Sequence, residues 1–187
     1  MGMTKGITAN NYLRLVAERS TAAQLEQIKA QLPPGGLATL YGAPIPAAGF
    51  VDYGAVMQLL LAADKVLGKG DLAFLREASF KNQDANLNGV YKALLPFASP
   101  AFILQQASKL WRRYHDTGRL TAERTGPAGV VVRLLDYKDI PPHHGPEIEG
   151  AFEGLLHHAK AKGVTTRHTQ CVLDGAPWCE WQVSWLE

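Results

Sequence analysis

Apolar residues recur at helical spacing through the first half of the chain. One helix is predicted after Asn10 and another after Ser20-Thr21, and the run Pro33-Pro34-Gly35-Gly36 ends the second. The clearest helix begins after Asp52, a favourable N-cap residue. Its apolar face carries Val56, Leu59, Leu60, Ala63 and Leu67. Residues 37–51 are rich in Gly, Pro and Ala and are predicted to form a loop, with a short extended piece at 37–41.

Three more helices are predicted before residue 120. The first begins at Asp71, and the second spans about 88–97. The third has the strongest start signal, because Ser99 can cap a helix and Pro100 suits its first position. Its apolar stripe carries Phe102, Ile103, Leu110 and Trp111, and Gly118 ends it.

After residue 119 the period of the pattern changes from helical spacing to alternation. Segments 120–124 and 130–135 are predicted to form one hairpin, and segments 164–173 and 178–185 a second, joined by a helix at about 146–162. In the last strand, apolar Cys179, Trp181, Val183 and Trp185 alternate with polar residues, as in a half-buried strand. We therefore expect a single α+β domain, with a mainly helical part at 1–97 and an α/β core at 98–187.

Composition and charge narrow the classes of function. The net charge is +2 and the basic residues are scattered, so no nucleic-acid-binding surface is expected. The longest apolar run, residues 59–63, is far too short to cross a membrane. The chain has two cysteines and shows no secretory signal. Because these features are typical of a reducing compartment, we expect a cytoplasmic protein.

Two segments resemble a known group of proteins. The helix after Ser99, with its end Leu-Trp-Arg-Arg-Tyr-His-Asp-Thr-Gly-Arg at 110–119, is similar to a helix in a myxobacterial family of uncharacterised paralogues, which is distantly similar to the 4-vinyl reductase domain. The segment Cys-Val-Leu-Asp-Gly-Ala-Pro-Trp-Cys-Glu-Trp at 171–181 resembles the C-x3-G-x3-C-x-F ending of that domain. The resemblance implies the nitric oxide signalling and Golgi transport ligand-binding fold, in which helices and a sheet enclose a small apolar ligand.

The resemblance also implies a candidate zinc site. In phenol-sensing members of the group, the two hairpin cysteines bind zinc with a Glu three residues earlier and a Cys at the start of the preceding helix. This chain keeps Cys171 and Cys179, has His168 in place of Glu, and has His144 or His143 near the helix start in place of Cys. Because residues 168 and 171 point to opposite faces of a regular strand, the site requires a bulge. Plain burial of both cysteines and a disulfide across the hairpin are the alternatives.

Haem and enzyme chemistry are not expected from the sequence. The haem-based nitric oxide sensors of the group hold the propionates with a Tyr-x-Ser-x-Arg motif, which is absent here and argues against haem. His115, near a helix end, is expected to lie in solvent. The chain has no Gly-x-Ser-x-Gly motif, and Glu147 and Glu149 are expected in a first helical turn for electrostatic reasons alone.

Two function classes remain open. The first is a non-enzymatic sensory or ligand-binding module that holds a small apolar molecule, with or without structural zinc. Its pocket is expected to involve Leu59, Leu60, Phe102, Ile103, Leu110, Trp111 and Phe152. The second is a protein-interaction or scaffold domain with a filled core, acting as a homodimer. An apolar cavity with a few polar anchors would favour the first class, and a solid core with an exposed apolar patch the second. A lone sensory domain also needs a protein partner to pass on its signal.

Overall fold

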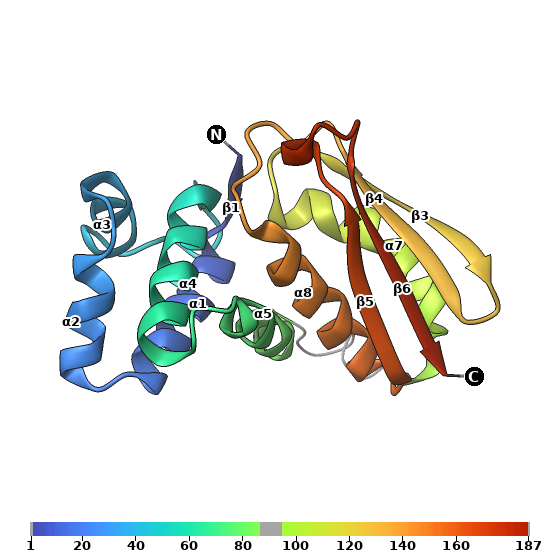
Figure 1. Ribbon diagram of the computed structural model, residues 1–187, viewed down its shortest axis with the longest axis horizontal. Helices are drawn as coiled ribbons and strands as arrows, with labels where there is room; N and C mark the ends of the chain where they lie inside the picture. Colours follow the sequence, from blue (N-terminus) through green and yellow to red (C-terminus); the bar gives the residue numbers. More distant parts are fainter. Residues whose placement is uncertain (1, 87–94, 187) are drawn as a thin grey trace.

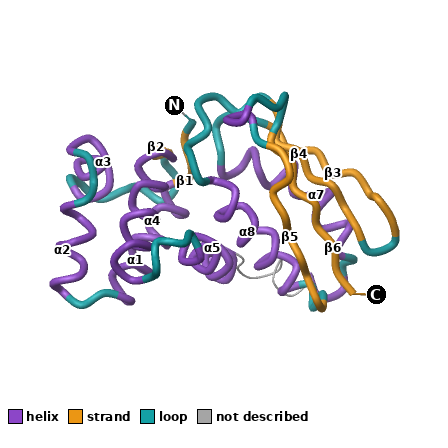
Figure 2. The backbone as a smooth tube through the Cα atoms, in the orientation of Figure 1, coloured by secondary structure: helices purple, strands orange, loops and turns teal. Residues whose placement is uncertain are grey.

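The computed structural model describes residues 2–86 and 95–186. Helices from the first half of the chain and the strands of the main sheet lie at opposite ends of the molecule, with helix α8 between them (Figures 1 and 2). Among the described residues, no helix has both the length and the hydropathy that a membrane crossing requires. The helix predicted at 88–97 lies mostly outside the described residues, and only its end, the 3-10 turn η1 (Leu95–Phe97), is seen.

The described part of the first half is helical, as predicted. It contains α1 (Gly6–Arg19), α2 (Ala22–Ala30), α3 (Pro34–Tyr41), α4 (Tyr53–Leu67) and α5 (Ala73–Asn86). Asp52 caps α4, because its carboxylate accepts a hydrogen bond of 2.9 Å from the Gly54 amide. Helix α3 replaces the loop and extended piece predicted over 37–41. Pro34 occupies its first turn, where proline favours a helix instead of ending one.

A two-stranded sheet of β1 (Met3–Lys5) and β2 (Phe50–Asp52) joins the two halves of the molecule. The sequence did not predict it, because three residues are too few to show alternation. Thr4 also pairs with His115, which directly follows helix α7 (Pro100–Tyr114). The Met3 amide donates to the Asp116 carboxylate at 2.7 Å. The start of the chain is therefore attached to the segment that enters the main sheet.

The main sheet is antiparallel and confirms the α+β class. Its strands β3 (Arg119–Gly126), β4 (Gly129–Leu135), β5 (Lys162–Gln170) and β6 (Cys179–Leu186) have the spatial order β3-β4-β6-β5. The side chains that alternate inward from its two middle strands are Val130, Val132, Leu134, Cys179, Trp181 and Val183. Helices α7 and α8 (His144–His158) pack against this face. The second apolar core lies among α1–α5.

Helix α8 lies between the two cores and packs closely against α5. A side chain at Gly150 would collide with the backbone carbonyl of Arg76, and one at Gly154 would lie 2.7 Å from the carbonyl oxygen of Phe80. These glycines stand four residues apart, so they share one face of the helix. Helix α8 begins two residues earlier than predicted and ends four residues earlier. Its early end is followed by Lys160, whose positive φ of 58° turns the chain into β5.

Candidate metal centre and ligand pocket

The loop before α8 directs His144 into the protein. His143 has a left-handed backbone conformation (φ 62°), and its side chain is exposed. The next residue, His144, is 1% exposed. Its Nδ1 atom donates a hydrogen bond of 2.8 Å to the Pro141 carbonyl, while its buried Nε2 atom has no hydrogen-bond partner among the described residues. A ring fixed in this way presents one nitrogen lone pair to its surroundings, as metal-binding histidines do. The structure therefore selects His144 over His143 for the cluster.

His168 approaches from the sheet. It lies on β5 opposite Trp181, and the two rings stack with centroids 4.6 Å apart. The register of β5 shifts between His168 and Gln170, so the bulge that a metal site requires is present. A side chain at Gly145 would come within 2.5 Å of His168 Nδ1, so glycine allows this close approach. Within residues 2–86 and 95–186, the buried Nε2 atom of His168 likewise has no hydrogen-bond partner.

The two cysteines complete the cluster. Cys171 follows β5, Cys179 opens β6, and both thiols are buried and free. The Val172 amide lies 3.5 Å from Cys179 Sγ and the Leu173 amide 3.4 Å from Cys171 Sγ, and both donate to sulfur. Burial raises the pKa of the Cys179 thiol to about 12. A metal ion would offset that cost by binding the thiolate directly.

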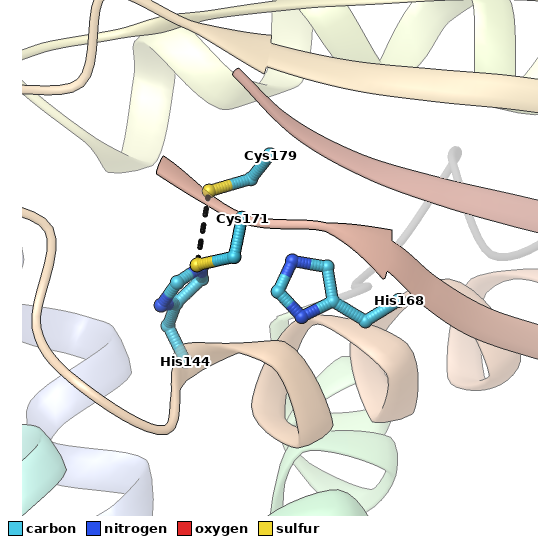
Figure 3. A group of neighbouring side chains, drawn as sticks. All are labelled: His144, His168, Cys171 and Cys179. Carbon is cyan, nitrogen blue, oxygen red and sulfur yellow. Dashed lines mark hydrogen bonds between the residues drawn. The ribbon is translucent and has the colours of Figure 1, made fainter. Parts of the chain in front are cut away.

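The spacing of the four side chains suits a tetrahedral zinc ion. One ligand atom from each of His144, His168, Cys171 and Cys179 lies within 4.8 Å of all the others. Figure 3 shows them gathered between the start of α8 and the ends of β5 and β6. The two sulfur atoms are 3.8 Å apart. Zinc–sulfur bonds of about 2.3 Å in tetrahedral geometry place two sulfurs about 3.8 Å apart.

The protonation states of the two histidines also suit metal binding. Burial lowers the pKa of His144 to about 4. Burial also lowers the pKa of His168. Both imidazoles are therefore neutral at pH 7, the form that binds a metal ion. Together with the spacing, the donors present fit zinc.

A separate pocket lies where α8 meets α5, α7 and the N-terminal helix α1. Its volume is about 120 Å³. Its apolar wall is formed by Leu110, Trp111, Leu120, Ile148, Phe152 and Leu155. The rest of the lining includes polar side chains, among them Thr8, His115 and Glu147. The pocket thus combines an apolar wall with a few polar groups, as small-molecule sites do.

The residues that the sequence assigned to this pocket are distributed over several places. Leu110, Trp111 and Phe152 line it. Ile103 is buried in the core beneath the sheet and Phe102 is 52% exposed, and neither belongs to the lining. The remaining two, Leu59 and Leu60, are fully buried in the separate core of the helical half. A helical stripe predicts burial, but it does not predict which cavity a buried residue borders.

The sequence missed the main polar group of the pocket, Glu147. Its carboxylate is buried and accepts hydrogen bonds from the Tyr12 hydroxyl at 2.5 Å, the Tyr53 hydroxyl at 2.7 Å and the Ser79 hydroxyl at 3.2 Å. Burial raises the pKa of Glu147, while the three hydrogen bonds oppose that rise. The expectation of a role in the helix dipole alone was therefore wrong. One signal was available, because Glu147 precedes Gly150 by one turn, on the face that packs against α5.

His115 differs from expectation as well. Instead of lying free in solvent, its ring stacks on Trp111 with centroids 3.9 Å apart, and its Nδ1 atom lies 3.4 Å from the Tyr137 hydroxyl. Burial lowers the pKa of His115 to about 3. The Trp111 indole is held in place by a hydrogen bond of 3.0 Å to the Thr117 carbonyl. The pocket wall therefore includes a neutral imidazole.

Comparison with known proteins identifies the fold. An H-NOX protein from S. oneidensis in the Fe(II)NO state aligns over 98% of this chain and 99% of its own, with a TM-score of 0.73 and 12% identity. The Fe(II) unliganded H-NOX protein from K. algicida aligns over 98% and 97%, with a TM-score of 0.69 and 14% identity. The chain has the H-NOX fold. No protein-family model and no curated protein matches the sequence.

The H-NOX fold corrects the expectation about haem. The propionate-binding motif is missing from this chain, but the expectation against haem was wrong, because solved structures with this fold include Fe(II) H-NOX proteins and an H-NOX structure that probes haem distortion. In this chain His115 offers the pocket an imidazole, a common ligand of haem iron. As the side chains lie, the pocket of about 120 Å³ is smaller than the roughly 300–1,000 Å³ of sites for larger ligands. A haem would fit only after Trp111 and its neighbours moved.

Proposed function

We propose that this protein is a non-enzymatic sensory module that holds a small, largely apolar molecule in the pocket beside α8. The observation that carries the proposal is the pocket of about 120 Å³ between the two apolar cores. An engineered apolar cavity of roughly 150 Å³ binds benzene, so a pocket of this size suits one ring. The H-NOX fold, shared with proteins solved in Fe(II)NO and Fe(II)CO states, supports a ligand-binding role.

The same pocket favours this class over the alternative of a scaffold with a filled core. A filled core would have brought the apolar faces of α7 and α8 together without leaving space. Instead, Trp111 and Phe152 border a common opening. Homodimer formation is a separate question, and either class of protein could be dimeric.

Benzene is the simplest probe of the pocket. We expect its addition to shift the nuclear magnetic resonance signal of the Trp111 indole N–H, because that ring lines the pocket, and we expect the shift to saturate. Ala151, which also lines the pocket, provides a blocking variant. The substitution Ala151→Leu adds three carbon atoms to the wall and should abolish the saturable shift.

The matched control is Ala23→Leu, the same substitution at an exposed position of α2. It should leave benzene binding unchanged. A Trp111 signal that does not respond to benzene, or that responds equally in the two variants, would contradict the proposed pocket.

We further propose that His144, His168, Cys171 and Cys179 hold a structural zinc ion. Two imidazole nitrogens without a hydrogen-bond partner in the described part of the chain, together with the 3.8 Å separation of the sulfurs, support this assignment. Four protein ligands fill a tetrahedral zinc ion, so no position remains for substrate and the role is structural. The metal would fasten the tip of the last hairpin to the start of α8.

Native mass spectrometry of the purified protein tests the zinc assignment. We expect one zinc ion per chain in the wild type and none in Cys171→Ser or His168→Ala. His143→Gly is the matched control, because His143 is the immediate neighbour of His144 but lies outside the cluster. The assignment would be overturned if both Cys171→Ser and His168→Ala retained zinc. It would also be overturned if the wild-type protein, purified with zinc, had a mass equal to that of the bare chain.

The free thiols and the proposed sensory role also bear on where the protein acts and on what it acts with. We propose a cytoplasmic protein, since two free buried thiols suit a reducing compartment. A separate signalling protein would have to read the bound state of the module. Pull-down with the benzene-loaded and free protein would show whether a partner distinguishes the two states.

A further inference from the structure

The polar end of the pocket carries a buried acidic group. Glu147 is 8% exposed, and its three hydrogen bonds come from Tyr12 on α1, Tyr53 on α4 and Ser79 on α5. A carboxylate has about four lone-pair positions for hydrogen bonds. Three hydroxyl donors therefore leave this carboxylate able to accept one more bond.

The carboxyl of Glu147 has no cationic partner within the part of the chain that the structure describes. The groups that act on its carboxyl are three neutral hydroxyls, and the ion pairs of the described residues do not include it. The neighbouring Glu149 and Glu153, in contrast, both pair with Arg76. Burial without a cationic partner raises the pKa of Glu147, and a cation bound in the pocket would stabilise its ionised carboxylate.

A second group in the pocket also lacks a partner. Thr8 lines the same pocket, is 7% exposed, and its buried Oγ1 atom makes no hydrogen bond to any residue that the structure describes. A buried hydroxyl without a partner is uncommon in native proteins and indicates a missing group. Thr8 Oγ1 can accept a hydrogen bond, as can Glu147. Because the Thr8 hydroxyl can donate or accept while an ionised Glu147 can only accept, a hydrogen-bond donor is the one kind of group that could bind both.

We propose that the ligand is a small protonated amine on an apolar ring or short chain, whose ammonium group binds Glu147 and Thr8 while its hydrocarbon part contacts Trp111 and Phe152. An ammonium group supplies both the donors and the positive charge that the pocket lacks. A neutral alcohol would supply a donor without the charge, and a carboxylic acid would be repelled. The inference rests on the proposed ligand-binding function and specifies its ligand class.

Three compounds with six heavy atoms each separate charge from shape. They are methylcyclopentane, which is apolar, cyclopentanol, which is a neutral donor, and cyclopentylamine, which is protonated at pH 7. Binding is followed through the Trp111 indole signal. We expect the amine to bind at least about tenfold more tightly than the other two. The variant Glu147→Gln should remove that preference while the hydrocarbon binds as before.

Thr8→Val provides a second variant of nearly equal shape. It should weaken amine binding about threefold and leave methylcyclopentane unaffected, and it keeps the test informative if Glu147→Gln does not fold. An amine that binds no more tightly than the hydrocarbon, or a preference that survives these substitutions, would overturn the inference. Failure of all three compounds to bind would instead refute the pocket, and with it the proposed function.

Discussion

At the scale of single residues, His143 bears backbone strain beside the metal cluster. Its φ of 62° lies in the left-handed region, which costs a non-glycine residue roughly 1 kcal/mol. This conformation turns the chain so that His144 enters α8 with its ring inside the protein. The strained backbone of His143 thus accompanies the inward placement of His144, a candidate zinc-binding side chain.

His143→Gly should therefore stabilise the protein. Glycine adopts positive φ without steric cost, so we expect the free energy of unfolding to rise by about 0.5–1 kcal/mol in urea titrations. Zinc content should not change. A loss of stability would show that the exposed His143 side chain stabilises the folded state by more than the backbone strain destabilises it.

His115 should make stability depend on pH. Its pKa of about 3 in the folded state is below the ordinary 6.5, so the unfolded chain takes up a proton first as the pH falls. The free energy of unfolding is therefore unaffected by protonation of His115 well above pH 6.5. Between pH 6.5 and pH 3 it falls as the pH falls, with a slope of at most about 1.4 kcal/mol per pH unit. Urea titrations at pH 7, 6 and 5 should show a steeper loss in the wild type than in His115→Gln. Parallel pH profiles would contradict the assignment of this dependence to His115.

At the scale of elements, the contact between α5 and α8 positions the polar groups of the pocket. Gly150 and Gly154 let the two helices approach closely, and this approach brings Ser79 within hydrogen-bonding distance of Glu147. The same helix begins at His144, so the candidate zinc site and the pocket share α8. The two glycines therefore matter to the pocket without lining it.

Gly150→Ala should be strongly destabilising. Its added carbon would collide with the backbone carbonyl of Arg76, which cannot move without shifting α5. We expect a loss of more than about 2 kcal/mol, as for other overpacked sites. Gly35→Ala in α3 is the control, since the added carbon meets nothing within 4 Å. It should stabilise by about 0.5–1 kcal/mol, and similar effects of the two substitutions in thermal unfolding would refute the close-contact argument.

At the scale of the whole molecule, α8 lies between two cores and helps to join them. One core is formed by α1–α5, and the other by α7, α8 and the sheet. Glu147 connects them through its hydrogen bonds to Tyr12 and Tyr53. The candidate zinc ion would in turn fix the start of α8 to the sheet.

Zinc removal should therefore weaken the whole fold. A metal bound at 1,000 times its dissociation constant stabilises the folded state by about 4 kcal/mol. We expect a chelator to lower the melting temperature of the wild type by several degrees, and added zinc to restore it. Cys171→Ser should melt at the same temperature with and without the chelator. An unchanged wild-type melting temperature would argue against a structural role for the metal.

Much of the fold could be predicted from the sequence because local patterns encode it. Helix periodicity, the caps at Asp52 and Ser99, and strand alternation at 179–185 all indicated the correct element type. Helix α3 was missed because proline signals both the end of one helix and the start of the next. The strands at 3–5 and 50–52 were missed because they are short and pair across a long stretch of chain.

The candidate sites were only partly visible in the sequence. The hairpin motif indicated Cys171 and Cys179, and residue spacing added His168 and His144. Glu147 was expected in a first helical turn for electrostatic reasons alone, because nothing local shows that α1, α4 and α5 enclose that turn. Burial of a charged residue depends on contacts between distant segments, and a single sequence does not display those contacts.

By itself, the sequence determined the α+β class, the approximate positions of most helices and strands, and the cysteine hairpin, since each depends on residues near one another in the chain. Only the tertiary structure decided which histidine joins the cysteines and where the pocket lies. It also placed Glu147 and Thr8 in the lining of the pocket, where, among the described residues, Glu147 has no cationic partner and the Thr8 hydroxyl has no hydrogen-bond partner. These features arise where α8 meets elements from both halves of the chain. Their physical basis is burial and close approach, which exist only once the two cores have packed together.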